Sequence, residues 1–131
     1  MASLAIVLMA TCVFFLATGQ TPSGWVVPDK YKTLKNPTPA NKENTANGKD
    51  LYAKHCKSCH GVAGLGDGPK AATLGEACGD FSTAKFQGQT DGEIFYKVTE
   101  GKGKMPSFKK TIPEDNDRWN LVLYMRSFKS K

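Results

Sequence analysis

Cys56-Lys57-Ser58-Cys59-His60 is the stretch that decides the fold of this chain. Two cysteines separated by two residues and followed at once by a histidine have the spacing that attaches a c-type haem. The two thiols lie close enough to bond to the two vinyl groups of one porphyrin, and the next residue brings an imidazole to the iron. The motif therefore predicts one covalent haem c, attached to Cys56 and Cys59, with His60 as an axial iron ligand.

Two other kinds of site share the Cys-x-x-Cys spacing. A structural zinc site needs four ligands, and the remaining candidates, His55, Cys78 and Cys12, are not paired at ligand spacing. A thioredoxin-like dithiol lies between a strand and a helix of a βαβ unit, and no stretch of this sequence shows the alternation of a strand. Haem attachment is therefore the favoured interpretation, and zinc retained by the purified protein would favour a zinc knuckle instead.

The iron also needs a second axial ligand or an open coordination position. His55 lies on the same segment as His60 and cannot reach the opposite face of the porphyrin. Of the four methionines, two lie in an apolar leader and one in a C-terminal helical pattern, which leaves Met105. Met105 lies in a glycine-rich stretch, where Pro106 favours an extended backbone at the residue before it. We expect Met105 to be the second ligand, and the alternative is a methionine that fills a gap in the core.

Apolar periodicity and capping signals predict an all-α domain, with three to five short helices wrapped around one haem. The clearest start signal is the capping box of Thr90 and Glu93, and acidic residues that follow Pro113 complement the dipole of the last helix. The segment 61–68 is too rich in glycine for regular structure and indicates a loop that passes close to a flat ligand. The expected helices cover residues 46–56, 70–74 and 91–100, and a last one opens near residue 113.

These residues resemble the small class I (monohaem) cytochromes c of bacteria. Gly48-x-x-x-Tyr52, just ahead of the cysteine motif, is similar to that family's N-terminal helix, and Leu121-x-x-Tyr124 resembles the C-terminal helix that crosses it. The resemblance covers about residues 46 to 129. It implies the cytochrome c fold, in which the small glycine lets the two helices approach closely and aromatic side chains pack over the crossing.

The N-terminal part of the chain indicates export. Residues 1–19 carry no charged side chain and fit the apolar part of a secretory signal peptide, with a small-residue cleavage pattern at 17–19 but no basic residues ahead of it. An uncleaved membrane anchor is the alternative, since about 18 uncharged residues can just cross a bilayer. Residues 20–45 form a proline-rich linker or arm, which is either a solvated tether or docks through Trp25 on the haem domain or a partner. Residues 46–131 form the monohaem cytochrome c domain.

Two cysteines lie outside the haem motif. Apolar residues continue directly after Cys12, so cleavage before it would leave a hydrophobic tail. Cys12 is therefore interpreted as an ordinary leader residue rather than a lipidation site. Cys78 is expected to be a small buried side chain rather than a reactive thiol.

The chain has a net charge of +6, which persists without its uncharged leader. In the family that the sequence resembles, one haem edge is exposed between the segments around the cysteine motif and Met105. Lysines at that edge would steer an acidic redox partner, and solubility is the alternative reason for them. A nucleic-acid partner is disfavoured by export and by the absence of a recognition motif. The lysines concerned are Lys54, Lys57, Lys102, Lys104, Lys109 and Lys110.

Two protein ligands leave the iron no position for oxygen or a substrate, which predicts one-electron transfer rather than an enzyme activity. The resemblance implies a carrier in the periplasm or at the outer face of the cytoplasmic membrane. Its partners would be a membrane quinol-oxidising complex, a terminal oxidase or a reaction centre. A membrane-bound subunit of a larger respiratory or photosynthetic complex is the second interpretation. A haem enzyme or gas sensor is the third, in which Met105 would be absent from the iron.

Overall fold

The structure is a computed structural model that describes residues 24–75 and 77–129; the expected leader, with Cys12, lies outside these residues. The described chain is all-α, as predicted: it has no strand, and one isolated bridge joins Lys102 and Met105. None of its helices is long and apolar enough to cross a membrane. The helices are α1 (Asp29–Lys32), α2 (Lys42–His55), α3 (Lys57–His60), α4 (Ala71–Leu74), α5 (Ala84–Gln87), α6 (Asp91–Glu100) and α7 (Asp115–Arg126).

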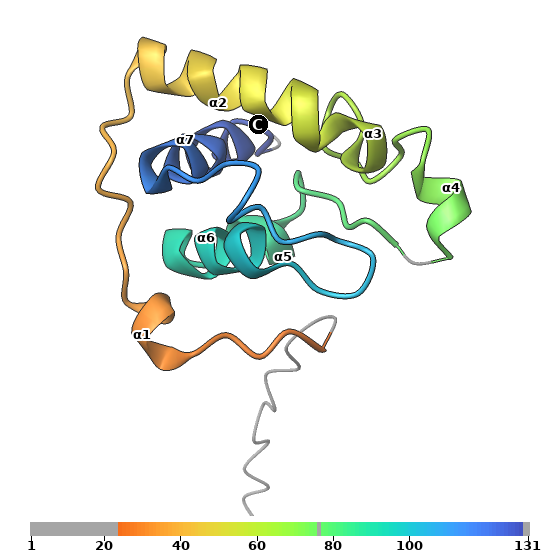
Figure 1. The fold of residues 1–131 in the computed structure, drawn as a ribbon, viewed down its shortest axis with the longest axis horizontal. Coiled ribbons are helices and arrows are strands. Elements are labelled where there is room, and N and C mark those ends of the chain that lie inside the picture. Colours follow the sequence, from red (N-terminus) through yellow and green to blue (C-terminus); the bar gives the residue numbers. More distant parts are fainter. Residues whose placement is uncertain (1–23, 76, 130–131) are drawn as a thin grey trace, which may run out of the picture.

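The three longest helices form the frame of the described domain. Figure 1 shows α2 along one edge with α7 beside it, α6 on the other side of α7, and α1 beyond α6. The remaining helices are single turns within the connections. Apolar side chains from α2, α6, α7 and the loops fill one core between them. The buried members are Tyr52, Phe81, Ile94, Phe95, Val98, Phe108, Ile112, Trp119, Leu121, Val122 and Met125.

The crossing of α2 and α7 has the form that the family resemblance implies. A Cβ atom at Gly48 would lie 2.0 Å from the backbone oxygen of Asn120 and 3.1 Å from Cβ of Tyr124, so no larger residue fits there without a shift. The ring of Tyr52 meets that of Tyr124 edge-on, with the centroids 5.3 Å apart. Leu121 is fully buried. The small residue and the aromatic pair therefore set how closely the two helices approach.

The helix starts follow their capping residues. Helix α2 begins at Lys42 rather than at the expected residue 46, because the side chain of Asn41 accepts a 2.8 Å hydrogen bond from the backbone nitrogen of Asn44. Helix α6 has the predicted bounds, and both hydrogen bonds of its capping box are present, at 2.7 and 3.2 Å. Helix α7 begins at Asp115, two residues beyond the proline expected to open it.

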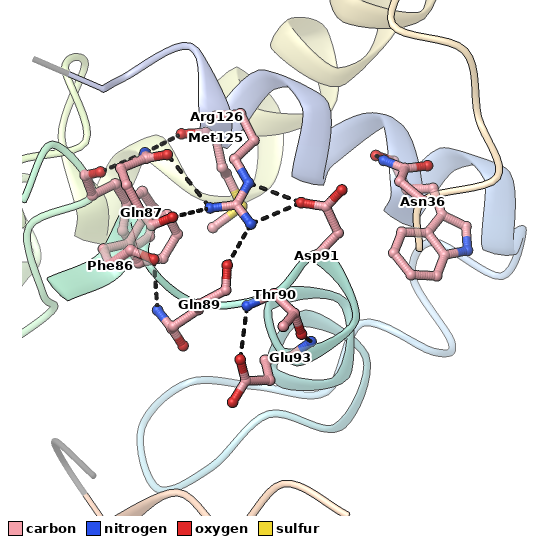
Figure 2. Close-up of polar contacts among 11 residues, drawn as sticks. Asn36, Phe86, Gln87, Gln89, Thr90, Asp91, Glu93, Met125 and Arg126 are labelled. Atoms are coloured by element: carbon pink, nitrogen blue, oxygen red, sulfur yellow. Dashed lines mark hydrogen bonds and ion pairs between the residues drawn. The ribbon is translucent and has the colours of Figure 1, made fainter. Parts of the chain in front are cut away.

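Arg126 fastens the end of α7 to the connection between α5 and α6. Its guanidinium donates hydrogen bonds to the carboxylate of Asp91 at 2.8 Å, to the backbone oxygen of Gln87 at 2.8 Å and to that of Gln89 at 2.6 Å. Figure 2 shows these bonds converging on the one side chain, next to the capping box of α6. The last helix is therefore held at its C-terminal end by polar contacts and at its middle by the crossing.

The described part of the N-terminal arm docks on the helical domain. The ring of Tyr31 lies 4.8 Å from that of Tyr96, and a Cβ atom at Gly92 would lie only 1.9 Å from the backbone oxygen of Tyr31. Further along, the amide of Asn36 donates a 3.0 Å hydrogen bond to the backbone oxygen of Trp119. Of the two alternatives from the sequence, the structure shows a docked arm rather than a solvated tether.

Candidate haem site

The cysteine motif forms a single helical turn. A break at Cys56 separates α2 from α3, and the backbone nitrogens of Cys59 and His60 both donate to the backbone oxygen of Cys56, at 3.1 and 2.9 Å. The two thiols and the imidazole therefore belong to consecutive positions of one turn. Across residues 24–75 and 77–129, no group of three or more His, Cys, Asp and Glu side chains is placed to hold a metal ion. The zinc alternative thus has no ligand set in the described chain.

The thiol of Cys56 does not have the properties of a redox dithiol. Burial raises the pKa of Cys56 to about 12, and the neighbouring Cys59 contributes in the same direction. The thiol is therefore protonated at neutral pH. Dithiol redox sites of the Cys-x-x-Cys type depend on the reverse, a thiolate formed at a lowered pKa. The surroundings of Cys56 favour a thiol that is held in place as part of a structure.

His60 has the features of a metal ligand. Its ring stacks on that of Phe81, with the centroids 4.5 Å apart and an angle of 29° between the planes. Its Nδ1 atom is buried and has no hydrogen-bond partner in the described chain. Burial lowers the pKa of His60, and a hydrogen bond with the backbone of Cys78 opposes this effect with a smaller contribution. The imidazole is neutral at pH 7, which is the form that binds a metal. The turn therefore fits the ligand set of a covalent haem.

The glycine-rich segment after the motif folds back onto α3. The backbone nitrogen of Gly66 donates to the oxygen of His60 at 2.9 Å, and that of Gly68 donates to the oxygen of Cys59 at 3.1 Å. A Cβ atom at Gly68 would lie 2.5 Å from the backbone oxygen of Ser58. The hydroxyl of Tyr52 donates a buried 2.8 Å hydrogen bond to the oxygen of Gly61. The predicted loop is present, and its close neighbour in the structure is the backbone of α3.

Met105 lies in the loop between α6 and α7. Its backbone nitrogen donates to the oxygen of Lys102 at 3.0 Å, and its oxygen accepts from the nitrogen of Lys102 at 2.8 Å. The side chain is half-buried and packs against the core. Phe108, at the end of the loop, lies edge-on to His55 with the ring centroids 6.1 Å apart. This contact joins the Met105 loop to the last turn of α2, directly ahead of the cysteine motif.

Two aromatic residues of this region were not identified from the sequence. Phe81 and Phe108 lie in irregular segments, where no helical or strand period indicates the direction of a side chain. Cys78, expected to be buried, is half-buried, and its backbone contacts His60.

The all-α domain and its Cys-x-x-Cys-His turn with a half-buried, neutral histidine define a c-type cytochrome. The family described as "Cytochrome C oxidase, cbb3-type, subunit III" matches residues 43–125. The chain belongs to this family of monohaem c-type cytochromes, and haem c, covalently bound, is its cofactor. It is an electron-transfer protein. No curated protein matches the chain by sequence.

Solved structures agree with this assignment. One is the Kuenenia stuttgartiensis reducing HAO-like protein complex Kustc0457/Kustc0458, at 33% identity and a TM-score of 0.64, covering 72% of this chain and 47% of that one. This chain thus spans less than half of that relative. Another is the KustC0563 c-type cytochrome, at 33% identity and a TM-score of 0.55, covering 63% and 98% of the two chains. Cytochrome cL from Hyphomicrobium denitrificans, at 18% identity and a TM-score of 0.53 over 84% and 71%, supports the fold.

Proposed function

We propose that this protein transfers single electrons through a haem c attached to Cys56 and Cys59, with His60 and Met105 as the axial ligands. The observation that carries the proposal is the single Cys-x-x-Cys-His turn, in which His60 stacks on Phe81 and its buried Nδ1 atom has no hydrogen-bond partner in the described chain. When bound, the haem supplies an Fe(III)/Fe(II) couple. Of the two methionines in the described chain, Met125 is buried within α7, whereas Met105 lies in a loop whose Phe108 contacts His55 at the end of α2.

Each of these residues has a distinct task in the proposed site. Cys56 and Cys59 fix the cofactor to one turn of the chain, so that it cannot dissociate. Phe81 restricts rotation of the His60 ring by stacking on it. The thioether of Met105 would bind the haem iron as the second protein ligand and would keep water, oxygen and substrates away from it. A metal with two protein ligands reacts by outer-sphere electron transfer, and a His/Met pair favours a comparatively high potential.

The ligand assignment is tested by Met105→Ala. We expect the wild-type ferric protein to show the sulfur-to-iron charge-transfer band near the red edge of its spectrum, and the variant to lose it. The reduced variant should also bind carbon monoxide at neutral pH, because one axial position is then open. Met125→Leu is the matched control, since it changes the other described methionine and should leave both readings unchanged. Absence of the band from the wild-type protein would reject Met105 as a ligand.

We further propose that the protein acts in the periplasm or at the outer face of the cytoplasmic membrane and exchanges electrons with protein partners that have acidic surfaces. The uncharged segment 1–19 supports export. A permanently bound subunit of a larger complex is the second candidate, favoured by the oxidase-subunit description of the family and by the complex among the similar structures. The mass of the native protein shows whether residues 1–19 are retained, and membrane fractionation separates the two candidates.

A further inference from the structure

Trp25 connects the N-terminal arm to the loop that carries Met105. The Nζ atoms of Lys97 and Lys102 each lie 5.7 Å from the centroid of its ring, which is within the range of cation–π attraction. Lys97 belongs to α6, and Lys102 belongs to the loop that follows α6. The ammonium group of Lys102 also donates a hydrogen bond to the backbone oxygen of Gly24. One aromatic side chain of the arm therefore contacts both the helix and the loop.

The position of Met105 depends on Lys102. The two residues exchange a pair of backbone hydrogen bonds, at 2.8 and 3.0 Å, and the two residues between them are exposed. The other end of the loop is fastened separately, because the hydroxyl of Ser107 donates to the backbone oxygen of Thr99 at 2.7 Å. Movement of Lys102 would therefore be passed directly to Met105.

The arm is fixed well enough to hold Lys102. Val27, two residues after Trp25, is 8% exposed. The ring contact between Tyr31 and Tyr96 and the hydrogen bond of Asn36 then fasten the arm to α6 and α7. Because these contacts do not involve the loop, they keep Trp25 in place independently of whether the loop is open or closed.

We propose that Trp25 and Lys102 are positioning residues, which hold the Met105 loop closed and limit the release of Met105 from the iron. This inference rests on the proposed function, since it takes Met105 as the second ligand. An external ligand such as imidazole binds the iron only when Met105 has left. Its apparent affinity is therefore the intrinsic affinity multiplied by the open fraction of the loop. Loss of the Trp25 contacts should raise that fraction about tenfold.

The test is a titration of the ferric holoprotein with imidazole. We expect Trp25→Ala to bind imidazole about tenfold more tightly than the wild-type protein, and Trp25→Phe, which keeps an aromatic face, to lie between them. Val26→Ala is the matched control, because Val26 is the next residue of the arm and is 85% exposed. Lys102→Gln should act in the same direction as Trp25→Ala. The double variant should change the imidazole affinity by less than the sum of the two single effects, because both substitutions remove the same contact between Trp25 and Lys102.

Hydrogen exchange of the segment 101–108 gives a reading that does not depend on the iron. The backbone nitrogen of Met105 donates to Lys102, so its exchange should be faster in Trp25→Ala than in Val26→Ala. Unchanged exchange and unchanged imidazole affinity would overturn the inference while the charge-transfer band still supported Met105 as a ligand. If the wild-type protein lacked that band, Met105 would not be an iron ligand. The inference that Trp25 and Lys102 limit the release of Met105 would then fail with it. If Trp25→Ala loses its helical circular dichroism, it has unfolded and is not used. Trp25→Phe and Lys102→Gln then test the inference by the same imidazole titration and the same hydrogen-exchange measurement.

Discussion

The neutral state of His60 follows from its immediate surroundings. Stacking on Phe81 removes water from one face of the ring, and the buried Nδ1 atom has no protein partner in the described chain. Burial lowers the pKa of His60, so protonation does not compete with metal binding at neutral pH. The neighbouring Cys56 is likewise half-buried, and its thiol is protonated because burial raises its pKa. The turn is therefore organised around a bound group rather than around thiolate chemistry.

At this scale the attachment residues can be tested directly. We expect Cys56→Ala/Cys59→Ala to lose all its haem to acid–acetone extraction, because no thioether then remains, whereas the wild-type protein keeps its haem under the same treatment. Cys78→Ala is the matched control, since it removes a thiol outside the motif and should retain the haem. Wild-type protein that releases its haem, or that contains zinc in its place, would contradict covalent attachment at this motif.

Among the helices, the crossing of α2 and α7 is the contact most sensitive to size. Gly48→Ala places a Cβ atom 2.0 Å from the backbone oxygen of Asn120, and backbone atoms cannot move aside as the end of a flexible side chain can. We expect a loss of about 3 kcal/mol in the free energy of unfolding, measured by denaturant titration of the holoprotein. In Gly88→Ala, the control, the new atom would meet only the oxygen of Ala84, at 3.0 Å. An equal loss in both variants would show that the crossing is not the cause.

Helix bounds could be predicted where the residues that set them lie close together in the sequence. The capping box gave α6 its observed bounds, because both partners lie within four residues of each other. The first turn of α2 was missed, since residues 42–45 carry no apolar period and Asn41 lies in a stretch with the composition of a linker. Docking of the arm was left open, because the bond from Asn36 to Trp119 joins residues 83 positions apart.

The same distinction applies to the candidate site. Cys56, Cys59 and His60 are recognisable by spacing alone because they share one helical turn. Met105 could be selected only by elimination, since its loop lies 45 positions after His60 and carries no local signal of a metal ligand. Phe81 and Trp25 escaped assignment to the site because each acts through a contact with a distant segment, and local sequence carries no signal for such contacts.

For the whole molecule, the net charge of +6 predicts how electron-transfer rates depend on salt. Oxidation of the reduced protein by ferricyanide, an anion, should slow as ionic strength rises, whereas oxidation by a cationic cobalt complex should accelerate. Lys104→Gln, in the exposed part of the Met105 loop, should weaken the ferricyanide dependence more than Lys35→Gln, an exposed lysine of the arm. If the oxidation rate depended equally on ionic strength in the two variants, only the total charge would matter. The loop would then not lie at the surface through which the electron leaves.

The partial burial of Cys56 also leads to an expectation about the order in which the molecule is assembled. In an unfolded chain its thiol has an ordinary pKa near 9.0 and is open to reagents, whereas in the folded chain it is half-buried and protonated. The crossing of α2 and α7 brings Asn47 to Asp117, 70 positions later, so it cannot close until nearly the whole domain is present. A growing or unfolded chain therefore offers the cysteines before the last helix can cover them. We therefore expect thioether formation to come first and docking of the final helix to follow it.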